Sequence, residues 1–163
     1  MTRAGPLTSE LEALYERRYA HFLLVTTAIL GEEASGHDAV QDGFARALRK
    51  QGTFRGDGPL EAWVWRLVVN AALGLRRQRV SRREDPAAAG GAEANGHVLD
   101  ESGIRAWVAA LPEQERLAVY LRYYADLDYR AIAQVLGIEV GTVSATLSSA
   151  HKALRRSLEE VGR

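Results

Sequence analysis

The feature that most restricts how this chain of 163 residues can fold is a stretch in its middle, residues 84–103, that has no sustained apolar pattern. The stretch contains Pro86 and four glycines, and all five of its Asp, Glu, Lys and Arg residues are acidic. Small, acidic and glycine-rich sequence of this kind is typical of a flexible linker. The chain therefore divides into two segments, 1–83 and 104–163, and each has to form its own core.

Apolar residues on both sides of this linker recur at intervals of three and four, which is the period of an α-helix. No run of alternating β-branched residues indicates a strand. We therefore predict an all-α fold of two small helical domains joined by the flexible linker.

Three helices are expected in the first domain. The first begins near Thr8, whose hydroxyl is a suitable N-cap, and the second covers about residues 36–50. The third follows Pro59, which a first helical turn tolerates, and runs to about Arg79. The second helix has one apolar stripe, formed by Val40, Phe44, Ala47 and Leu48. Its opposite side carries four polar residues: Asp38, Gln41, Asp42 and Arg49.

The third helix has apolar residues around most of its circumference, so we expect it to be central to the first domain. It ends in a basic cluster of five arginines: Arg76, Arg77, Arg79, Arg82 and Arg83. A helix C-terminus favours some basic residues, but five within eight positions exceed that need and suit a phosphate backbone.

In the second domain we expect helices at about residues 104–111 and 112–125, followed by two shorter ones. The last two match a helix-turn-helix over residues 129–148, with Gly137 suited to the left-handed turn and Asp128 to the N-cap. The inward positions of this motif are all apolar: Ile132, Ala133, Leu136, Ile138, Val143 and Leu147. Any two packed helices with a glycine turn are the alternative, but the two stripes and the turn agree with each other.

The second helix of such a motif enters the major groove of DNA, and its outward residues meet the base edges. These residues are small or carry a hydroxyl: Val140, Gly141, Thr142, Ser144, Ala145 and Ser148. None of them is the Arg or Asn that reads a base with two hydrogen bonds. Lys152, Arg155 and Arg156 follow and are suited to phosphates. We expect low affinity from this helix alone, so that a partner must supply the rest.

The overall composition narrows the classes of function. Equal numbers of basic and acidic residues, 21 of each, are unusual for a protein that holds DNA by itself. The absence of cysteine excludes disulfides, thiolate metal sites and thiol nucleophiles, and fits a cytoplasmic location. We expect no signal peptide, because the N-terminus is polar and charged and lacks an apolar core. We expect no membrane span, because no segment reaches about 20 apolar residues.

At this point the chain resembles the extracytoplasmic-function (ECF) sigma factors, the smallest relatives of sigma-70, which keep region two, a linker and region four. The resemblance is carried by "DAVQDGFARAL", "FRGDGPLEAWVWRLVVNAALGLRRQR" and "LPEQERLAVYLRYYADLDYRAIAQVLGIEVGTV". It implies a region two in 1–83, a linker in 84–103 and a region four in 104–163. It also implies that the chain binds bacterial core RNA polymerase and promoter DNA and directs transcription initiation, with no cofactor.

The resemblance assigns residues to each of these tasks. Contacts to core polymerase would come from Asp38, Gln41, Asp42 and Arg49, although a solvated helix face is the alternative for these residues. The minus-ten element would be held by Phe54, Arg55, Asp57, Trp63, Arg66, Asn70, Arg76, Arg77 and Arg79. The minus-thirty-five element would be read by Val140, Gly141, Thr142, Ser144, Ala145, Ser148, Ser149, Lys152 and Arg155. An anti-sigma protein is often a further partner in this family.

Several positions depart from the family pattern. Ser144, Thr146 and Ser149 stand where the family commonly has Lys or Arg, and Glu139 stands where it has a serine cap. Gly74 replaces a frequent aspartate, which costs about 1 kcal/mol of helix propensity relative to alanine.

The residues also leave other functions to weigh. An autonomous dimeric helix-turn-helix regulator is the main rival, but the charge-poor second helix and zero net charge count against it. A helical enzyme would need a nucleophile, a metal set or a phosphate loop, and the sequence suggests none. The histidines have no spacing that suggests a metal or a catalytic base. We expect Trp65 and Trp107 to be core residues.

Overall fold

The structure is a computed structural model that describes residues 6–83 and 102–163. Within these ranges the regular elements are all helices, which confirms the prediction of an all-α fold. The chain forms two compact units, Met1–Asn95 and Gly96–Arg163, which we call unit 1 and unit 2. The expected linker, 84–103, lies outside the described residues except for its last two positions.

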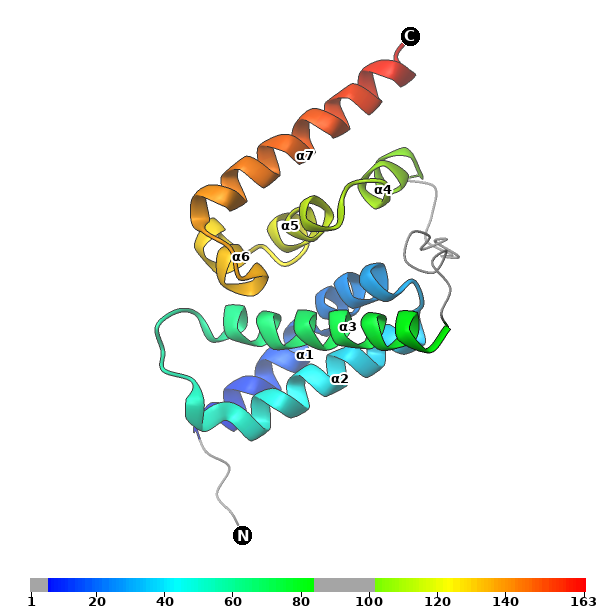
Figure 1. Ribbon diagram of the computed structural model, residues 1–163. Helices are drawn as coiled ribbons and strands as arrows, with labels where there is room; N and C mark the ends of the chain where they lie inside the picture. The colour runs from blue at the N-terminus through cyan, green and yellow to red at the C-terminus, as the bar shows by residue number, and fades with distance from the viewer. Residues whose placement is uncertain (1–5, 84–101) are drawn as a thin grey trace. The chain divides into compact units, whose positions relative to one another are not determined.

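Unit 1 is a bundle of three helices, α1 (Pro6–Leu30), α2 (Glu33–Lys50) and α3 (Leu60–Arg83), with a short 3-10 turn, η1 (Gln51–Thr53), after α2 (Figure 1). Each of the three helices contacts the other two. An aromatic cluster fills the centre, where the Phe22 ring stacks on Trp65 with centroids 4.0 Å apart. Phe44 meets Phe22 edge-on at 5.1 Å. Phe22 and Trp65 are fully buried, so the expectation that Trp65 is a core residue is confirmed.

Two glycines allow α2 to lie close to both of its neighbours. A Cβ added at Gly43 would lie 2.5 Å from Val68 Cγ2 and 2.6 Å from Val68 Cα, where α2 crosses α3. A Cβ at Gly36 would lie 2.5 Å from Thr27 Oγ1, where α2 crosses α1. The polar and packed faces of α2 are therefore fixed tightly relative to the rest of unit 1.

Two details of the first domain were predicted wrongly. Thr8 is not an N-cap, because α1 already begins at Pro6, and its hydroxyl instead donates to Gln51 Oε1 at 3.1 Å. Leu48 is not part of the core stripe and is 43% exposed. At 100° per residue, position 48 is rotated by about 80° from Val40, which carries it past the edge of the buried face.

Unit 2 contains α4 (Ser102–Ala109), α5 (Glu113–Tyr123), α6 (Tyr129–Leu136) and α7 (Val140–Val161). The first three helices lie along one side of α7, and each contacts it (Figure 1). The prediction that two shorter helices end the chain is right for α6, with 8 residues, and wrong for α7, with 22. The helical period continues beyond Leu147 through the buried Ala150 and the half-buried Leu154, so α7 continues as well.

Trp107 was expected in the core and is only half-buried. It lies on α4, which has 8 residues. Among the described residues no single helix is long and apolar enough to cross a membrane. Only α6 and α7 taken together pass such a test by length and composition, and they are bent by 98° at the turn between them.

Candidate functional site

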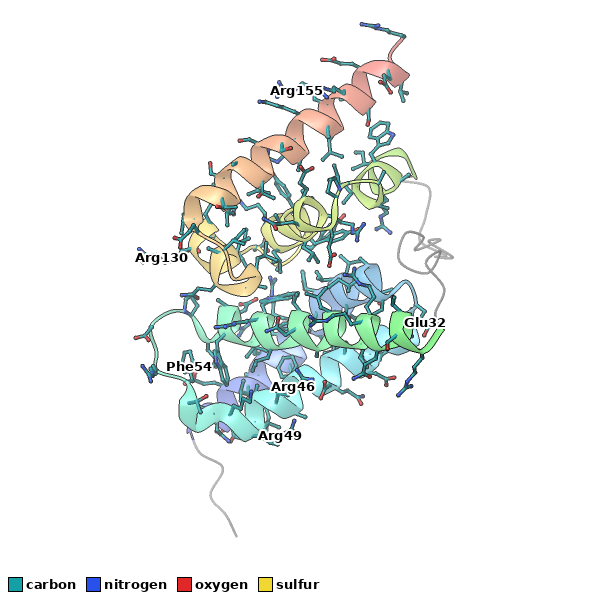
Figure 2. The ribbon with its side chains drawn as sticks, viewed as in Figure 1. Glu32, Arg46, Arg49, Phe54, Arg130 and Arg155 are labelled. Atoms are coloured by element: carbon teal, nitrogen blue, oxygen red, sulfur yellow. The ribbon has the colours of Figure 1, made fainter. Side chains whose placement is uncertain are left out.

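The polar face of α2 lies opposite its buried stripe. Val40 and Phe44 are 0% and 6% exposed, whereas Asp38, Gln41 and Arg49 are exposed to solvent. Asp42 is half-buried and its carboxylate pairs with Arg46 Nη2 at 2.8 Å. The structure therefore brings the four residues expected to meet polymerase onto the solvent side of one helix. Figure 2 places Arg46 and Arg49 on this helix.

The N-terminal end of the same helix carries a polar cluster that the sequence did not suggest. The Tyr19 hydroxyl is hydrogen-bonded to His37 Nδ1, and the two rings are stacked with centroids 5.5 Å apart. On the other side of the imidazole, Nε2 lies 3.5 Å from Glu33 Oε1. Desolvation, assisted by Tyr15, raises the pKa of Tyr19. A spacing of 18 residues between Tyr19 and His37 gives no local signal, so only the packing of α1 on α2 reveals the contact.

The loop between η1 and α3 presents an aromatic pair at one end of the bundle. The rings of Phe54 and Trp63 lie with centroids 5.3 Å apart, and both are half-buried. Figure 2 labels Phe54 in this loop. Gly56 has a φ of 73°, a left-handed conformation that glycine adopts without strain. Arg55 and Asp57 on either side of it are exposed.

One row of residues continues from this aromatic pair along the solvent face of α3. Trp63 is followed at helical intervals of three and four by Arg66, Asn70, Gly74 and Arg77. Arg66, Asn70 and Arg77 are exposed. The row contains cationic, amide and aromatic groups and no carboxylate, a combination suited to the phosphates and bases of nucleic acid.

The arginine cluster at the end of α3 is divided between two sides of the helix. Arg77 belongs to the exposed row, but Arg76 and Arg79 are half-buried and lie on other sides. Arg79 Nη1 donates to the carbonyl oxygen of Leu30 at 3.2 Å. Its Nη2 bonds the Glu32 carboxylate and the Ser35 hydroxyl. Figure 2 shows Glu32 close to the last turns of α3.

These contacts engage Arg79, one of the residues expected to hold the minus-ten element, within unit 1. Its guanidinium fastens α3 to the turn between α1 and α2, because the last carbonyls of α1 have no partner within their own helix. Helical spacing rotates Arg79 by about 160° from Arg77, but the sequence does not show that Leu30, Glu32 and Ser35 lie beside Arg79.

The helix-turn-helix of unit 2 has the local geometry expected from its sequence. Asp128 is the N-cap of α6, and its Oδ1 accepts a hydrogen bond from the Ala131 amide at 2.8 Å. Gly137 ends α6 with a φ of 67°. Ala133 is 6% exposed, where a small residue allows α6 and α7 to pack closely. The motif is therefore confirmed at its cap, its turn and its small inward residue.

The start of α7 separates buried and exposed residues as the motif requires. Val143 and Leu147 are buried, with 0% and 1% exposure. All residues expected to read DNA are exposed: Val140, Gly141, Thr142, Ser144, Ala145, Ser148, Ser149, Lys152 and Arg155. Figure 2 shows Arg155 on the outer side of α7.

Two hydroxyl residues of α7 have contacts within the domain. The Ser149 hydroxyl donates to Glu115 Oε1 of α5 at 2.7 Å, so this group is already engaged. Thr146 is 9% exposed and belongs to the packed side of the helix. Of these two departures from the family pattern, Ser149 therefore has a hydrogen-bond partner and Thr146 a buried position in this chain.

A further cation of the motif was missed at the sequence level. Arg130 is exposed in the first turn of α6, the helix that crosses the DNA backbone in a helix-turn-helix (Figure 2). Its position one residue after the start of the motif was the signal that could have identified it. Among the described residues, no group of three or more His, Asp and Glu side chains could hold a metal ion.

Comparison with protein families matches both units. Residues 14–82 match the model described as Sigma-70 region 2, and residues 103–154 match the model described as Sigma-70, region 4. Together the two matches cover most of both units.

Individual proteins and solved structures agree with these matches. The chain is 28% identical to the RNA polymerase sigma-H factor of Pseudomonas aeruginosa over 160 residues, which covers 87% of this chain and 83% of that protein. It is 26% identical to the ECF RNA polymerase sigma-E factor of Escherichia coli K12 over 159 residues, with the same coverage. The fold is similar to the sigma factor RpoE of Bartonella quintana in complex with the anti-sigma factor NepR, with a TM-score of 0.76, 20% identity and coverage of 93% and 98%. It is also similar to CnrH in complex with the cytosolic domain of CnrY, with a TM-score of 0.68, 22% identity and coverage of 93% and 89%.

Proposed function

Since this chain belongs to the sigma-70 family as one of its extracytoplasmic-function members, we propose that three exposed faces divide the tasks of a sigma factor among them. The chain binds core RNA polymerase and directs promoter recognition and transcription initiation. What remains to be assigned is which residues perform each step.

The first face is the polar side of α2, which we assign to core polymerase. Asp38, Gln41 and Arg49 are exposed there, and Asp42 is held by Arg46. Because Gly36 and Gly43 hold α2 close to both neighbouring helices, the face is presented on a rigid support. A rigid polar surface with both signs of charge is suited to a protein partner, whereas its carboxylates would repel DNA.

The second face is the Phe54 loop together with the exposed row on α3, which we assign to the minus-ten element. The assignment rests on one observation. The aromatic pair of Phe54 and Trp63 lies at the start of the exposed row, which contains Arg66, Asn70 and Arg77 and no carboxylate. Aromatic rings stack on unpaired bases, and arginines neutralise phosphates. The arrangement supports binding of single-stranded DNA, the form in which a minus-ten element is held after strand separation.

The third face is the outward side of the first turns of α7, which we assign to the minus-thirty-five element. Its readers are small or carry a hydroxyl, so base contacts there are single hydrogen bonds and methyl contacts. Lys152 and Arg155 farther along α7, and Arg130 on α6, supply contacts to phosphates. We propose a weak minus-thirty-five interaction that depends on the polymerase-bound state.

Region two would occupy 1–83, the linker 84–103 and region four 104–163. The chain would act in the cytoplasm and would catalyse no reaction itself. One solved structure similar to this chain contains the sigma factor RpoE with the anti-sigma factor NepR, so we include an anti-sigma protein among the partners of this chain.

The test is fluorescence anisotropy of the labelled chain titrated with bacterial core polymerase and, separately, with duplex DNA alone. Asp38→Arg should weaken polymerase binding by at least about tenfold, because reversing one interfacial charge replaces an attraction by a repulsion. Glu12→Arg, an equal charge reversal at an exposed position of α1, is the matched control and should bind like the wild type. Tight, salt-sensitive binding to duplex DNA without any binding to polymerase would instead support an autonomous regulator.

A further inference from the structure

Gly74 lies in the middle of α3, and unit 1 gives no reason for a glycine there. Apart from its chain neighbours and the nearby backbone of α3 itself, no atom of the described residues lies within 4 Å of a Cβ built at this position. Its φ is not in the left-handed region, where only Gly31, Gly56 and Gly137 among the described glycines are found. Glycine inside a helix reduces stability relative to alanine. Gly74 therefore differs from Gly43, where the backbone of Val68 leaves no room for a side chain.

The position of Gly74 connects it with the exposed row on α3. It follows Asn70 by four residues and precedes Arg77 by three, so the three residues lie on the same side of the helix. The side chains of Asn70 and Arg77 are exposed and border a place where the helix presents only its backbone. The row thus has a depression one side chain deep between an amide and a guanidinium.

We propose that Gly74 lets the sugar-phosphate backbone of one nucleotide of single-stranded DNA lie directly against α3. The inference rests on the proposed function and goes beyond it by assigning a role to a residue that has no side chain. A polyanion is favoured over a protein as the occupant because the row from Trp63 to Arg77 contains two arginines and no carboxylate. A Cβ at position 74 would hold the strand away from the helix and lengthen its contacts with both neighbours.

The test compares Gly74→Ala and Gly74→Leu with the wild type, each assembled with core polymerase. The probe is a labelled single-stranded DNA of 15 nucleotides with random sequence, and binding to core polymerase alone is subtracted. Gly74→Ala should raise the thermal midpoint of the chain and lower its affinity for the probe about fivefold, a fraction of what one nucleotide contributes. Gly74→Leu should lower the affinity further.

Two controls separate a steric cause from others. Gly52→Ala adds a methyl group at an exposed position of η1, where a Cβ also meets nothing within 4 Å, and should leave the affinity unchanged. The salt dependence of binding should have the same slope in the Gly74 variants as in the wild type, because no charge is lost.

The outcomes are distinct. If Gly74→Ala is more stable and both variants bind the probe as the wild type does, position 74 accepts a side chain without any effect on DNA binding. The inference is then overturned. If the wild-type chain neither binds core polymerase nor adds to its DNA binding, the proposed function fails, and the role of Gly74 fails with it.

Discussion

Replacing Arg79 by alanine should destabilise unit 1 without a direct effect on DNA binding. The guanidinium donates to the Leu30 carbonyl oxygen at 3.2 Å and bonds Glu32 and Ser35, so three contacts between α3 and the α1–α2 turn are lost. Hydrogen bonds to a charged group contribute about 1.5–3 kcal/mol where they are shielded from water. The Arg79 side chain is 36% exposed and that of Glu32 57%, so their ion pair adds little to the total.

We therefore expect a loss of about 1–2 kcal/mol in the free energy of unfolding, mostly from the carbonyl left without a partner at the end of α1. For a domain of this size each kcal/mol shifts the thermal midpoint by about 4–8 °C. The decrease should be seen in tryptophan fluorescence during heating. A Trp107→Phe background restricts the signal to Trp63 and Trp65, which both belong to unit 1.

Arg77→Ala is the matched variant, because it removes the same side chain from the exposed side of the same helix. It should leave the thermal midpoint unchanged, weaken binding of single-stranded DNA by the polymerase complex and reduce the salt dependence by about one phosphate contact. If Arg79→Ala melts like the wild type and instead loses DNA affinity as Arg77→Ala does, the assignment of Arg79 to the turn is refuted.

Three further predictions test the packing, the cap and the buried phenol. Gly43→Ala should cost about 1–3 kcal/mol in urea unfolding, because the added Cβ lies 2.6 Å from the Val68 Cα and backbone cannot move aside; a neutral result would contradict the close crossing of α2 and α3. Asp128→Ala should cost unit 2 about 1 kcal/mol through the lost hydrogen bond to Ala131, measured by the same unfolding, while Asp128→Asn should retain most of it. Burial raises the pKa of Tyr120 from 10.0, so folding favours its neutral form, and the stability this supplies should be lost as pH rises above about 10. Tyr120→Phe should show less of that alkaline loss in urea unfolding, and an unchanged pH profile would count against the raised pKa.

Much of the fold could be predicted because its signals are local. The cap at Asp128 and the left-handed turn at Gly137 each depend on residue types within a few positions of the motif. The sides of α2 followed from helical period alone, with the single error at Leu48, where the stripe was extended one position too far. The long α7 was underestimated because its later turns mix apolar and charged residues, as a half-exposed helix does.

The site was less predictable, because contacts between helices decide which side chains remain available. Arg77 and Arg79 belong to one cluster of arginines, and the contact of Arg79 with the turn at Leu30 is not visible in the sequence. In the sequence Ser149 likewise looks like the other hydroxyl residues of α7. Only the structure shows that its hydroxyl donates to Glu115 Oε1 of α5 at 2.7 Å. The contact of Tyr19 with His37 was missed for the same reason, since it joins two helices.

The division of α7 into buried and exposed sides affects how the sequences of related sigma factors can diverge in evolution. Val143, Thr146 and Leu147 hold the helix in its domain, while Ser144 and Ser148 make no packing contribution and face outward. Under the proposed assignment of this face to the minus-thirty-five element, substitutions at the outward positions should alter promoter preference at little cost in folding. Gene duplication followed by changes at a few such positions would yield a factor with a new set of target genes and an unchanged scaffold.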